Sequence, residues 1–294
     1  MDDPVWLSQY HSLVPGDPNP ARYRSWGTLR YILRGIEKFI PWVRNVYIIL
    51  SGPSQLPPYI DPSRVHIIYH KDIIPGRFLP CFSSNPIETY MWMIPGLSEY
   101  FVYFNDDMVP ISVCRKVDLF GGSEKIVARC SHVFSQPPTT PNIFHQIKQN
   151  CSELAACAAG ISIDFQGKLL GQRHGPTPLL RSACTECFRA IQSQIESITT
   201  PFRHPSNVCQ YLYSDYMLFR GLTDCGEVPQ SLTYIDFRKD SIEKATQFIT
   251  GPATQFICIN DSKEGVSETQ FPLYKSAICD AFEKLLPGRS HYEL

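Results

Sequence analysis

Short, largely apolar runs of strand length constrain the fold of this chain more than any other feature of its sequence. Four of them stand out, namely Val46–Leu50, Val65–Tyr69, Phe101–Phe104 and Gln255–Ile259. Strands that are apolar on both faces are typical of a parallel sheet covered by helices on each side. Apolar residues also recur at helical spacing from Trp26 to Phe39, and Pro41 ends that pattern. We therefore expect the α/β class, with a mostly parallel, Rossmann-like sheet and helices on both faces.

The rest of the chain is predicted to be largely helical. A short helix is expected over Pro86–Met93, a longer one from Ile143 to Ala159 that ends at Gly160, and a closing one over Lys275–Leu286. Leu179 to Ile198 is also interpreted as one helix, because its apolar residues share a face. No hinge-like linker interrupts the pattern, which favours a single catalytic domain over residues 1–294 with a helical insertion.

Composition and charge exclude several classes of protein. The 27 basic and 28 acidic side chains leave a net charge of -1, without the positive field that nucleic-acid binding requires. No apolar run approaches the roughly 18 residues of a membrane span. The opening residues MDDPVWLSQY lack the basic and apolar regions of a secretory signal. We expect a globular protein that is cytoplasmic, or peripheral to the inner face of the membrane, and binds no nucleic acid.

The 11 cysteines do not form a repeated pattern. Cys184 and Cys187 make one C-x-x-C motif, but a four-thiolate zinc site would need a second pair at similar spacing. We therefore interpret most of the cysteines, these two included, as small core residues.

Acidic and amide side chains follow two of the predicted strands. Asn105, Asp106 and Asp107 come directly after Phe101–Phe104, and Asn260 with Asp261 follows Gln255–Ile259. Ligands of open α/β sheets bind beyond the carboxyl ends of the strands, and oxygen ligands suit a hard divalent cation. A solvated turn is the alternative, since Asn and Asp favour turns. The repetition at two strand ends favours a binding site.

Three further segments carry candidate groups. Glu88 falls in the first turn of its predicted helix, where it could simply cap that helix. Arg173 and His174 precede the predicted helix at Leu179, and Arg203 lies with His204 in a loop. An imidazole can take a proton from a hydroxyl near neutral pH, and a guanidinium can hold a phosphate. Spacing alone does not pair these residues, and a loop histidine can also be structural.

Several longer motifs follow one another along the chain, among them Arg22–Ile49, His70–Ile73, Leu79–Glu88 and Tyr103–Met108. Together they resemble the second conserved region of the Stealth family of sugar-1-phosphate transferases. Segments similar to the third and fourth regions follow in order. The resemblance divides the chain into 1–20 (remnant of region 1), 21–125 (region 2), 170–222 (region 3) and 250–294 (region 4).

The resemblance implies an activity. Stealth enzymes move a hexose-1-phosphate, for example GlcNAc-1-phosphate, from a UDP-sugar to a sugar hydroxyl of a glycan acceptor. The product is a phosphodiester of capsular, exopolysaccharide or other cell-surface polysaccharide, and a nucleoside monophosphate leaves. The closing segment is more similar to the bacterial capsule enzymes than to the animal enzyme, the GlcNAc-1-phosphotransferase that tags lysosomal glycoproteins.

The resemblance also assigns roles to residues. His174, Asp107, Glu88 and Arg203 correspond to the catalytic pocket, with His174 as the general base or, alternatively, Asp107 as the base and His174 as a phosphate ligand. Arg173, Arg203 and Asn105 would bind the donor phosphates. A divalent cation, Mg²⁺ or Mn²⁺, would be held by Asp106, Asp107, Asn260 and Asp261.

The N-terminus departs from the family. Only Asp3–Leu7 is similar to the end of its first conserved region, so we expect a chain truncated at the N-terminus that lacks a central strand and the acids that follow it. Two other functions remain open. One is a metal-dependent glycosyltransferase that releases a nucleoside diphosphate, and the other is an inactive truncated remnant.

Overall fold

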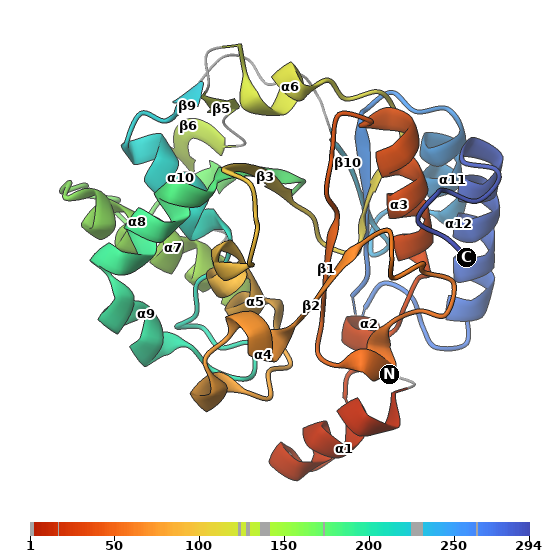
Figure 1. Cartoon of the computed structure of the whole chain (residues 1–294), viewed down its shortest axis with the longest axis horizontal. Coiled ribbons are helices and arrows are strands. Elements are labelled where there is room, and N and C mark those ends of the chain that lie inside the picture. The colour runs from red at the N-terminus through yellow and green to blue at the C-terminus, as the bar shows by residue number, and fades with distance from the viewer. Residues whose placement is uncertain are drawn as a thin grey trace. The chain divides into compact units, whose positions relative to one another are not determined.

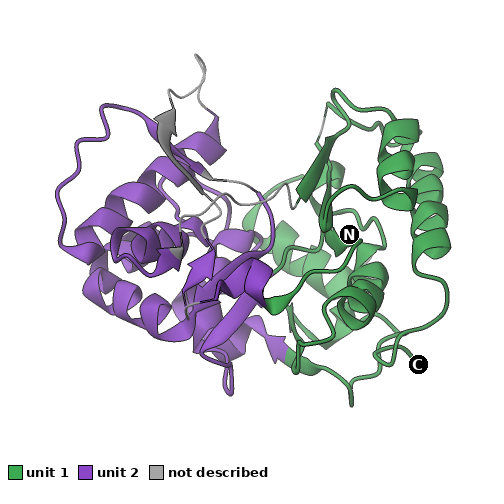
Figure 2. Cartoon of the chain, turned by 90° about the horizontal axis from the view of Figure 1, so that it is seen from above, with its two compact units in different colours: residues 1–67, 104–116, 229–294 green, residues 68–103, 117–228 purple. Residues whose placement is uncertain are grey.

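A computed structural model of the chain describes residues 3–16, 18–122, 125–127, 130–135, 142–172, 174–224, 232–262 and 264–294 (Figure 1). These residues form two compact units. Unit 1 contains residues 1–67, 104–116 and 229–294, and unit 2 contains residues 68–103 and 117–228, as Figure 2 shows in green and purple. The single catalytic domain expected from the sequence stays a prediction. No helix among the described residues has the length and apolar character needed to cross a bilayer.

Unit 1 is built around a three-stranded sheet. Its strand order is β10 (Leu232–Asp236), β11 (Phe256–Asn260) and β4 (Met108–Pro110). β10 and β11 run parallel, whereas β11 and β4 run antiparallel. All five residues of β11 except Asn260 are buried, as expected for a central strand that is apolar on both faces. The sheet therefore forms the core of the unit.

Helices and a second small sheet complete unit 1. α3 packs against β4, and α11 packs against α12. β1 pairs with β2, and the boundary between the two units falls within β2. The bounds are α1 (Pro4–Leu13), α2 (Pro20–Tyr23), α3 (Thr28–Phe39), β1 (Tyr47–Leu50), η1 (Pro53–Gln55), β2 (His66–Tyr69), α11 (Ile242–Thr250) and α12 (Phe271–Leu285).

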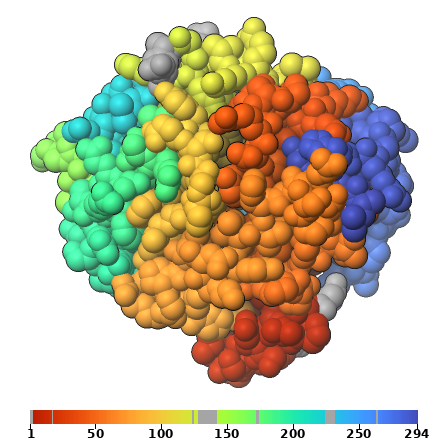
Figure 3. Space-filling view, in the orientation of Figure 1, coloured from red at the N-terminus to blue at the C-terminus, as the bar shows by residue number. Residues whose placement is uncertain are grey.

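Asp3 caps the N-terminal helix α1 and connects it to a later segment of the chain. The carboxylate of Asp3 accepts hydrogen bonds from the backbone N–H groups of Val5 and Trp6, which caps the helix. Its other oxygen accepts from the hydroxyl of Ser54 at 2.8 Å. The space-filling view shows the surface of α1 in red (Figure 3).

The described residues of unit 2 are mainly helical and form three two-stranded sheets. β3 pairs antiparallel with β8, β6 antiparallel with β7, and β5 parallel with β9. α7 packs closely along α10. The bounds are α4 (His70–Ile73), η2 (Gly76–Phe78), α5 (Ser84–Tyr90), η3 (Met91–Met93), β3 (Tyr100–Tyr103), α6 (Lys116–Phe120), β5 (Ile126–Val127), β6 (Cys130–Ser135), α7 (Ile143–Ala159), β7 (Leu169–Gln172), β8 (Thr177–Leu180), α8 (Arg181–Ala190), α9 (Gln192–Ile198), α10 (Tyr211–Phe219) and β9 (Thr223–Asp224).

The α/β class is confirmed, but the mostly parallel, Rossmann-like sheet is not. The described sheets are small and mixed. The strand expected over Phe101–Phe104 forms as β3, yet all four of its residues are only half-buried and it pairs antiparallel with β8. A run of apolar residues indicates burial, and it does not determine the direction of the neighbouring strand.

The helix predicted from Leu179 to Ile198 is wrong in its first part. Leu179 and Leu180 belong to β8, where they pair with Phe101 and Tyr100. The remainder is two helices, α8 and α9, separated at Ile191, whose backbone is not helical. Cys184 and Cys187 are fully buried in α8, which confirms them as core residues, and they belong to no metal-ligand group within the described part of the chain.

Candidate functional site

Three strand ends meet at one edge of the sheet in unit 1. Because β4 runs antiparallel to β11, the residues that lead into β4 lie beside the end of β11, and the backbone N–H of Ile259 donates to the carbonyl of Asp107 at 2.9 Å. Asn260 at the end of β11 pairs with Asp236 at the end of β10. We call Asn105, Asp106, Asp107, Asp236 and Asn260 the acidic edge. Asn105–Asp107 and Asn260, which follow two of the predicted strands, therefore lie at one edge of this sheet, and their role as a binding site stays a prediction.

Helix α3 fixes the backbone of the acidic edge. The hydroxyl of Thr28, the first residue of α3, donates to the carbonyl of Asp106. Further along the helix, Gly35 lies so close to β4 that a Cβ built on it would come within 2.5 Å of the carbonyl oxygen of Pro110. A helix can approach a strand this closely only where it has no side chain.

The carboxyls of the acidic edge differ in their surroundings. Asp107 is half-buried, and the buried thiol of Cys258 donates to its Oδ2 at 3.3 Å. Burial raises the pKa of that thiol well above its usual range, so Cys258 is a neutral donor here. Asp106 keeps an exposed surface, but the protein packed around its carboxyl, together with the charge of Asp107, raises its pKa to about 6. A carboxyl such as that of Asp106, whose charged form is disfavoured by burial and by a neighbouring carboxylate, suits a positively charged ligand.

The amide of Asn105 provides a test of whether a cation fits the acidic edge. Its Oδ1 is buried and has no hydrogen-bond partner among the described residues. A buried acceptor without a partner costs free energy, and it lies in the chain next to Asp106 and Asp107. One amide oxygen and two carboxylates are the ligand types that Mg²⁺ and Mn²⁺ take in proteins. The residues present therefore fit a divalent cation.

Asp261, predicted as a metal ligand, forms an ion pair with an arginine. Arg24 donates to both carboxylate oxygens, from Nε to Oδ2 at 2.6 Å and from Nη2 to Oδ1 at 2.8 Å, and Trp26 Nε1 donates to Oδ2 at 3.0 Å. Both charged side chains are 8% exposed. The pair ties the segment before α3 to the end of β11. Because a guanidinium already occupies both oxygens, this geometry gives no support to Asp261 as a metal ligand.

Asp236 is the member of the acidic edge that the sequence analysis missed. Arg238 donates to both of its oxygens, and these hydrogen bonds hold the pKa of the carboxyl below its usual value. The available signal was an acid directly after the alternating run Leu232–Ile235, which resembles the other two strand ends.

Glu88 lies in unit 2, in α5, and does not cap its own helix as the sequence suggested. Glu88 is 3% exposed, and its Oε2 accepts from the backbone N–H of Gln210 at 3.0 Å, at the start of α10. Asn85, one turn earlier in α5, donates to the carbonyl of Val208 at 3.1 Å. Two contacts thus anchor the start of α10 to α5. A carboxylate at a helix N-terminus is favoured by the helix dipole.

His174 reaches the same end of α10. Its Nδ1 lies 3.3 Å from the hydroxyl oxygen of Tyr211, the first residue of that helix. Glu88 and His174 therefore contact adjacent residues, Gln210 and Tyr211, and we call these four the α10 site. Arg173 lies outside the described residues.

Arg203 is presented by a loop that Asn207 organises. Asn207 accepts from the backbone N–H of His204 at 2.8 Å and donates to the carbonyl of Ile198 at 2.7 Å. Arg203 is exposed and makes no hydrogen bond or ion pair within the described ranges. A free guanidinium of this kind is available for a phosphate.

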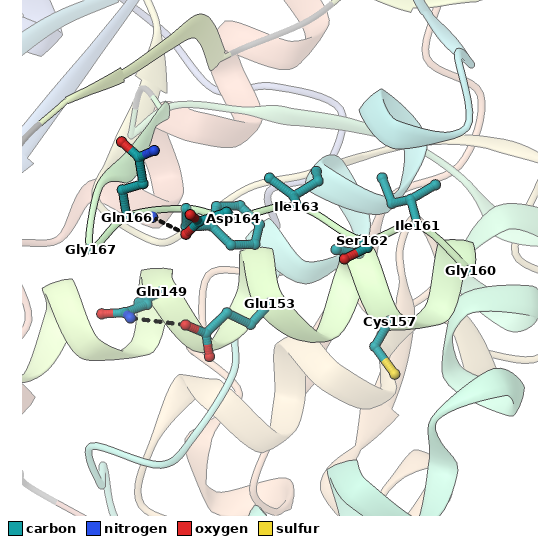
Figure 4. A pocket seen from close by; sticks show the side chains of 12 residues that line it. Gln149, Glu153, Cys157, Gly160, Ile161, Ser162, Ile163, Asp164, Gln166 and Gly167 are labelled. Atoms are coloured by element: carbon teal, nitrogen blue, oxygen red, sulfur yellow. Dashed lines mark hydrogen bonds between the residues drawn. The ribbon is translucent and has the colours of Figure 1, made fainter.

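A surface hollow of about 740 Å³ lies elsewhere in unit 2, between α7 and the loop that follows it (Figure 4). It contains none of the predicted site residues. Two of its acidic side chains accept hydrogen bonds within it, since Gln149 donates to Glu153 and the backbone of Gln166 donates to Asp164.

Comparison with known protein families finds a match for part of the chain. Residues 22–127 match the family model of Stealth protein CR2, conserved region 2. One part of the chain, residues 22–127, is thus similar to this Stealth region. This Stealth region includes α3, Glu88 and the Asn105–Asp107 part of the acidic edge. His174, Arg203 and Asn260 lie beyond it, and their assignment to further conserved regions stays a prediction.

Curated relatives match a larger part of the chain than the Stealth region. The receptor polysaccharide phosphotransferase WefC of Streptococcus oralis is 28% identical over 99% of this chain and 96% of its own length. The capsular polysaccharide phosphotransferase WcwK of Streptococcus pneumoniae is 26% identical over 100% of this chain and 96% of its own length. The exopolysaccharide phosphotransferase cps2G of Lactiplantibacillus plantarum is 42% identical, over 40% of this chain and 36% of its own.

Proposed function

We propose that this chain is a sugar-1-phosphate transferase in the synthesis of capsular or other cell-surface polysaccharide. The observation that carries the proposal is its similarity to WefC and WcwK over 99% and 100% of its length, since both are phosphotransferases by name. The acidic edge and the exposed Arg203 support it, because charge neutralisation and positioning are what phosphoryl transfer asks of a protein.

The proposed reaction is a displacement at phosphorus. The hydroxyl oxygen of the acceptor sugar attacks the phosphorus of a UDP-sugar that bears the sugar, for example in UDP-GlcNAc. The bond from that phosphorus to the bridging oxygen of the diphosphate breaks, UMP leaves with the bridging oxygen, and a phosphodiester forms. The proton of the hydroxyl passes to the enzyme.

The residues take separate roles in this reaction. His174 accepts the proton, a contribution of about 10²–10⁴-fold for a positioned base. Arg203, with Arg173, binds the diphosphate. Glu88 keeps the α10 site in place. The alternative roles, in which Asp107 is the base and His174 a phosphate ligand, are decided by the experiments below.

A divalent cation is part of the proposal. Asp106 and Asp107, with the amide oxygens of Asn105 and Asn260, would hold Mg²⁺ or Mn²⁺, and Asp261 is left out because Arg24 occupies it. The cation would offset the negative charge of the donor diphosphate. Binding of Mn²⁺, followed by electron paramagnetic resonance, should weaken in Asp106→Asn and Asp107→Asn. Equal Mn²⁺ affinity in the wild type and both variants would contradict this cation site.

Product analysis tests the reaction itself. The full chain is incubated with UDP-GlcNAc, an acceptor glycan and Mg²⁺, and the nucleotide released is identified by chromatography while ³¹P NMR follows the glycan. UMP together with a diester signal on the glycan supports the proposal. UDP, with no phosphorus in the product, would identify a glycosyltransferase instead.

Single variants test the roles. His174→Ala and Arg203→Ala should each lower turnover by at least about 10²-fold with little change in melting temperature. His204→Ala is the matched control, because His204 is exposed and its Nδ1 bonds within its own loop to Ser206 at 2.7 Å. A variant of His174 or Arg203 that keeps its specific activity and loses stability would show that the residue is structural.

A further inference from the structure

We propose that Tyr211 is a positioning residue that holds the imidazole of His174 with its proton on Nδ1. Nε2 is then left with a lone pair that can accept the proton of the acceptor hydroxyl. This inference rests on the proposed function, because it names the residue that prepares the proposed base. Its structural content, the position of one proton on His174, can be tested without any substrate.

The hydroxyl of Tyr211 is held in a fixed place. The side chain is only 2% exposed, and the ring of Phe144 meets its ring edge-on with the centroids 6.1 Å apart. Its backbone begins α10, which is tied to α5 through Gln210 and Glu88. A buried ring on an anchored helix cannot follow a moving imidazole, so the imidazole must adapt to the tyrosine.

The length of the contact indicates which group donates. Nδ1 and the tyrosine oxygen are 3.3 Å apart. Hydroxyl donors normally bring their acceptors to about 2.7–2.8 Å, whereas N–H donors bring theirs to about 2.9–3.0 Å with a range up to about 3.2 Å. The observed distance is longer than both ranges and lies nearer to that of N–H donors, which favours the imidazole as the donor. We therefore place the proton on Nδ1, donated to the oxygen of Tyr211.

The direction of this hydrogen bond separates the two roles considered for His174. A neutral imidazole carries one proton, and a hydrogen bond at one nitrogen decides the state of the other. With Nδ1 protonated, Nε2 is an acceptor and suits a general base. If Tyr211 donated to Nδ1 instead, Nε2 would carry the proton and His174 would suit a phosphate ligand.

Nitrogen NMR tests the proton position directly. The full chain is labelled with ¹⁵N-histidine and studied above about pH 8, where free histidine is neutral, and His174→Gln assigns the signals of His174. The wild type should show Nδ1 protonated. Tyr211→Phe keeps the ring but removes the oxygen, and it should shift the proton toward Nε2. Tyr216→Phe, a buried tyrosine of the same helix, is the control that should leave the signals of His174 unchanged.

Kinetics test the consequence for catalysis. Tyr211→Phe should lower kcat by about 10- to 100-fold, the usual cost of removing the partner that orients a working histidine. The KM for UDP-GlcNAc should stay within about threefold, because a positioning residue for the base does not bind the donor. Tyr216→Phe should retain the kcat of the wild type.

Each adverse result has its own meaning. A proton on Nε2 in the wild type, or the same proton position in Tyr211→Phe, would overturn the inference. So would a loss of kcat that follows the unfolded fraction measured by circular dichroism, since that is a structural effect. If no variant and no donor yields UMP, the proposed function fails, while the NMR result still decides the hydrogen bond.

Discussion

The interior of unit 2 changes the pKa of one buried carboxyl, that of Asp215. Its carboxyl has no exposed surface, and the hydroxyl of Ser152 on α7 donates to it at 2.7 Å. Burial raises its pKa to about 8, against the lowering effects of that hydrogen bond and of the charge of Lys148. At neutral pH the carboxyl is therefore largely protonated.

Stability should consequently fall with rising pH because of Asp215. Its pKa is higher in the folded state than in the unfolded state, so its contribution is fully present below about pH 4 and is lost as the pH rises through about 8. Within that window the free energy of unfolding should fall by up to about 1.4 kcal/mol per pH unit from this group. Urea unfolding of the wild type and Asp215→Asn at a series of pH values measures the difference. Parallel pH profiles of the two proteins would contradict the raised pKa.

The ion pair between Arg24 and Asp261 predicts a second effect at the residue scale. Because both side chains are 8% exposed, Arg24→Gln leaves a poorly solvated carboxylate and should lower the free energy of unfolding by about 3 kcal/mol. Arg238→Gln is the matched control, since Arg238 is 47% exposed in its pair with Asp236 and should cost less than about 1 kcal/mol. Equal costs in urea unfolding would show that the two pairs do not differ in solvation.

Some residues of the candidate site could be read from the sequence, whereas others could not. Asn105–Asp107 and Asn260 were predictable, because an acid or amide after an apolar strand marks a strand end wherever the strand lies. The partners of Asp261 and Glu88 were not predictable from spacing, since Arg24 and Gln210 are 237 and 122 residues away in the chain. Only the folded chain shows that Asp261 pairs with Arg24 and that Glu88 accepts a hydrogen bond from the start of a different helix.

At the scale of elements, the contact between α3 and β4 positions the acidic edge. A Cβ on Gly35 would lie 2.5 Å from the carbonyl oxygen and 3.1 Å from the Cβ of Pro110. Gly35→Ala should therefore push the helix from the strand and cost about 1–3 kcal/mol of stability.

A substitution at a second glycine is the control for this prediction. Gly52 has an extended backbone and nothing within 4 Å of a built Cβ, so Gly52→Ala should leave the melting temperature within experimental scatter. Differential scanning calorimetry of both variants compares them. A Gly35→Ala protein as stable as Gly52→Ala would mean that the helix and strand have room to separate without loss.

Elements whose sequence signals are local were predicted accurately, whereas elements that depend on a distant partner were not. The helix over Ile143–Ala159 was predicted to the residue, because its stop at Gly160 is local and Gly160 adopts the left-handed conformation with φ 68°. Leu179 and Leu180 were assigned to a helix because their partner strand, β3, lies nearly 80 residues earlier. Strand pairing over such distances leaves no local pattern in the sequence.

At the scale of the whole molecule, unit 2 should depend on both of its segments. β8 pairs with β3, and Tyr213 donates from its hydroxyl to the carbonyl of Thr89. Both partners lie in 68–103, whereas β8 and Tyr213 lie in 117–228. A fragment of residues 117–228 should therefore show no cooperative thermal unfolding by circular dichroism, and adding the fragment 68–103 should restore it. A sharp transition of 117–228 alone would show that this segment folds independently.

The two units alternate along the sequence, and this order limits how gene fusion or recombination can produce such a chain. Unit 1 is encoded in three stretches and unit 2 in two, with changes after residues 67, 103, 116 and 228. Joining two genes end to end keeps each product in one continuous stretch, so simple fusion cannot produce this order. A chimera of two related genes with a single crossover inside 68–228 takes parts of both units from each parent. Both units of such a chimera must then tolerate sequence from two parents at once.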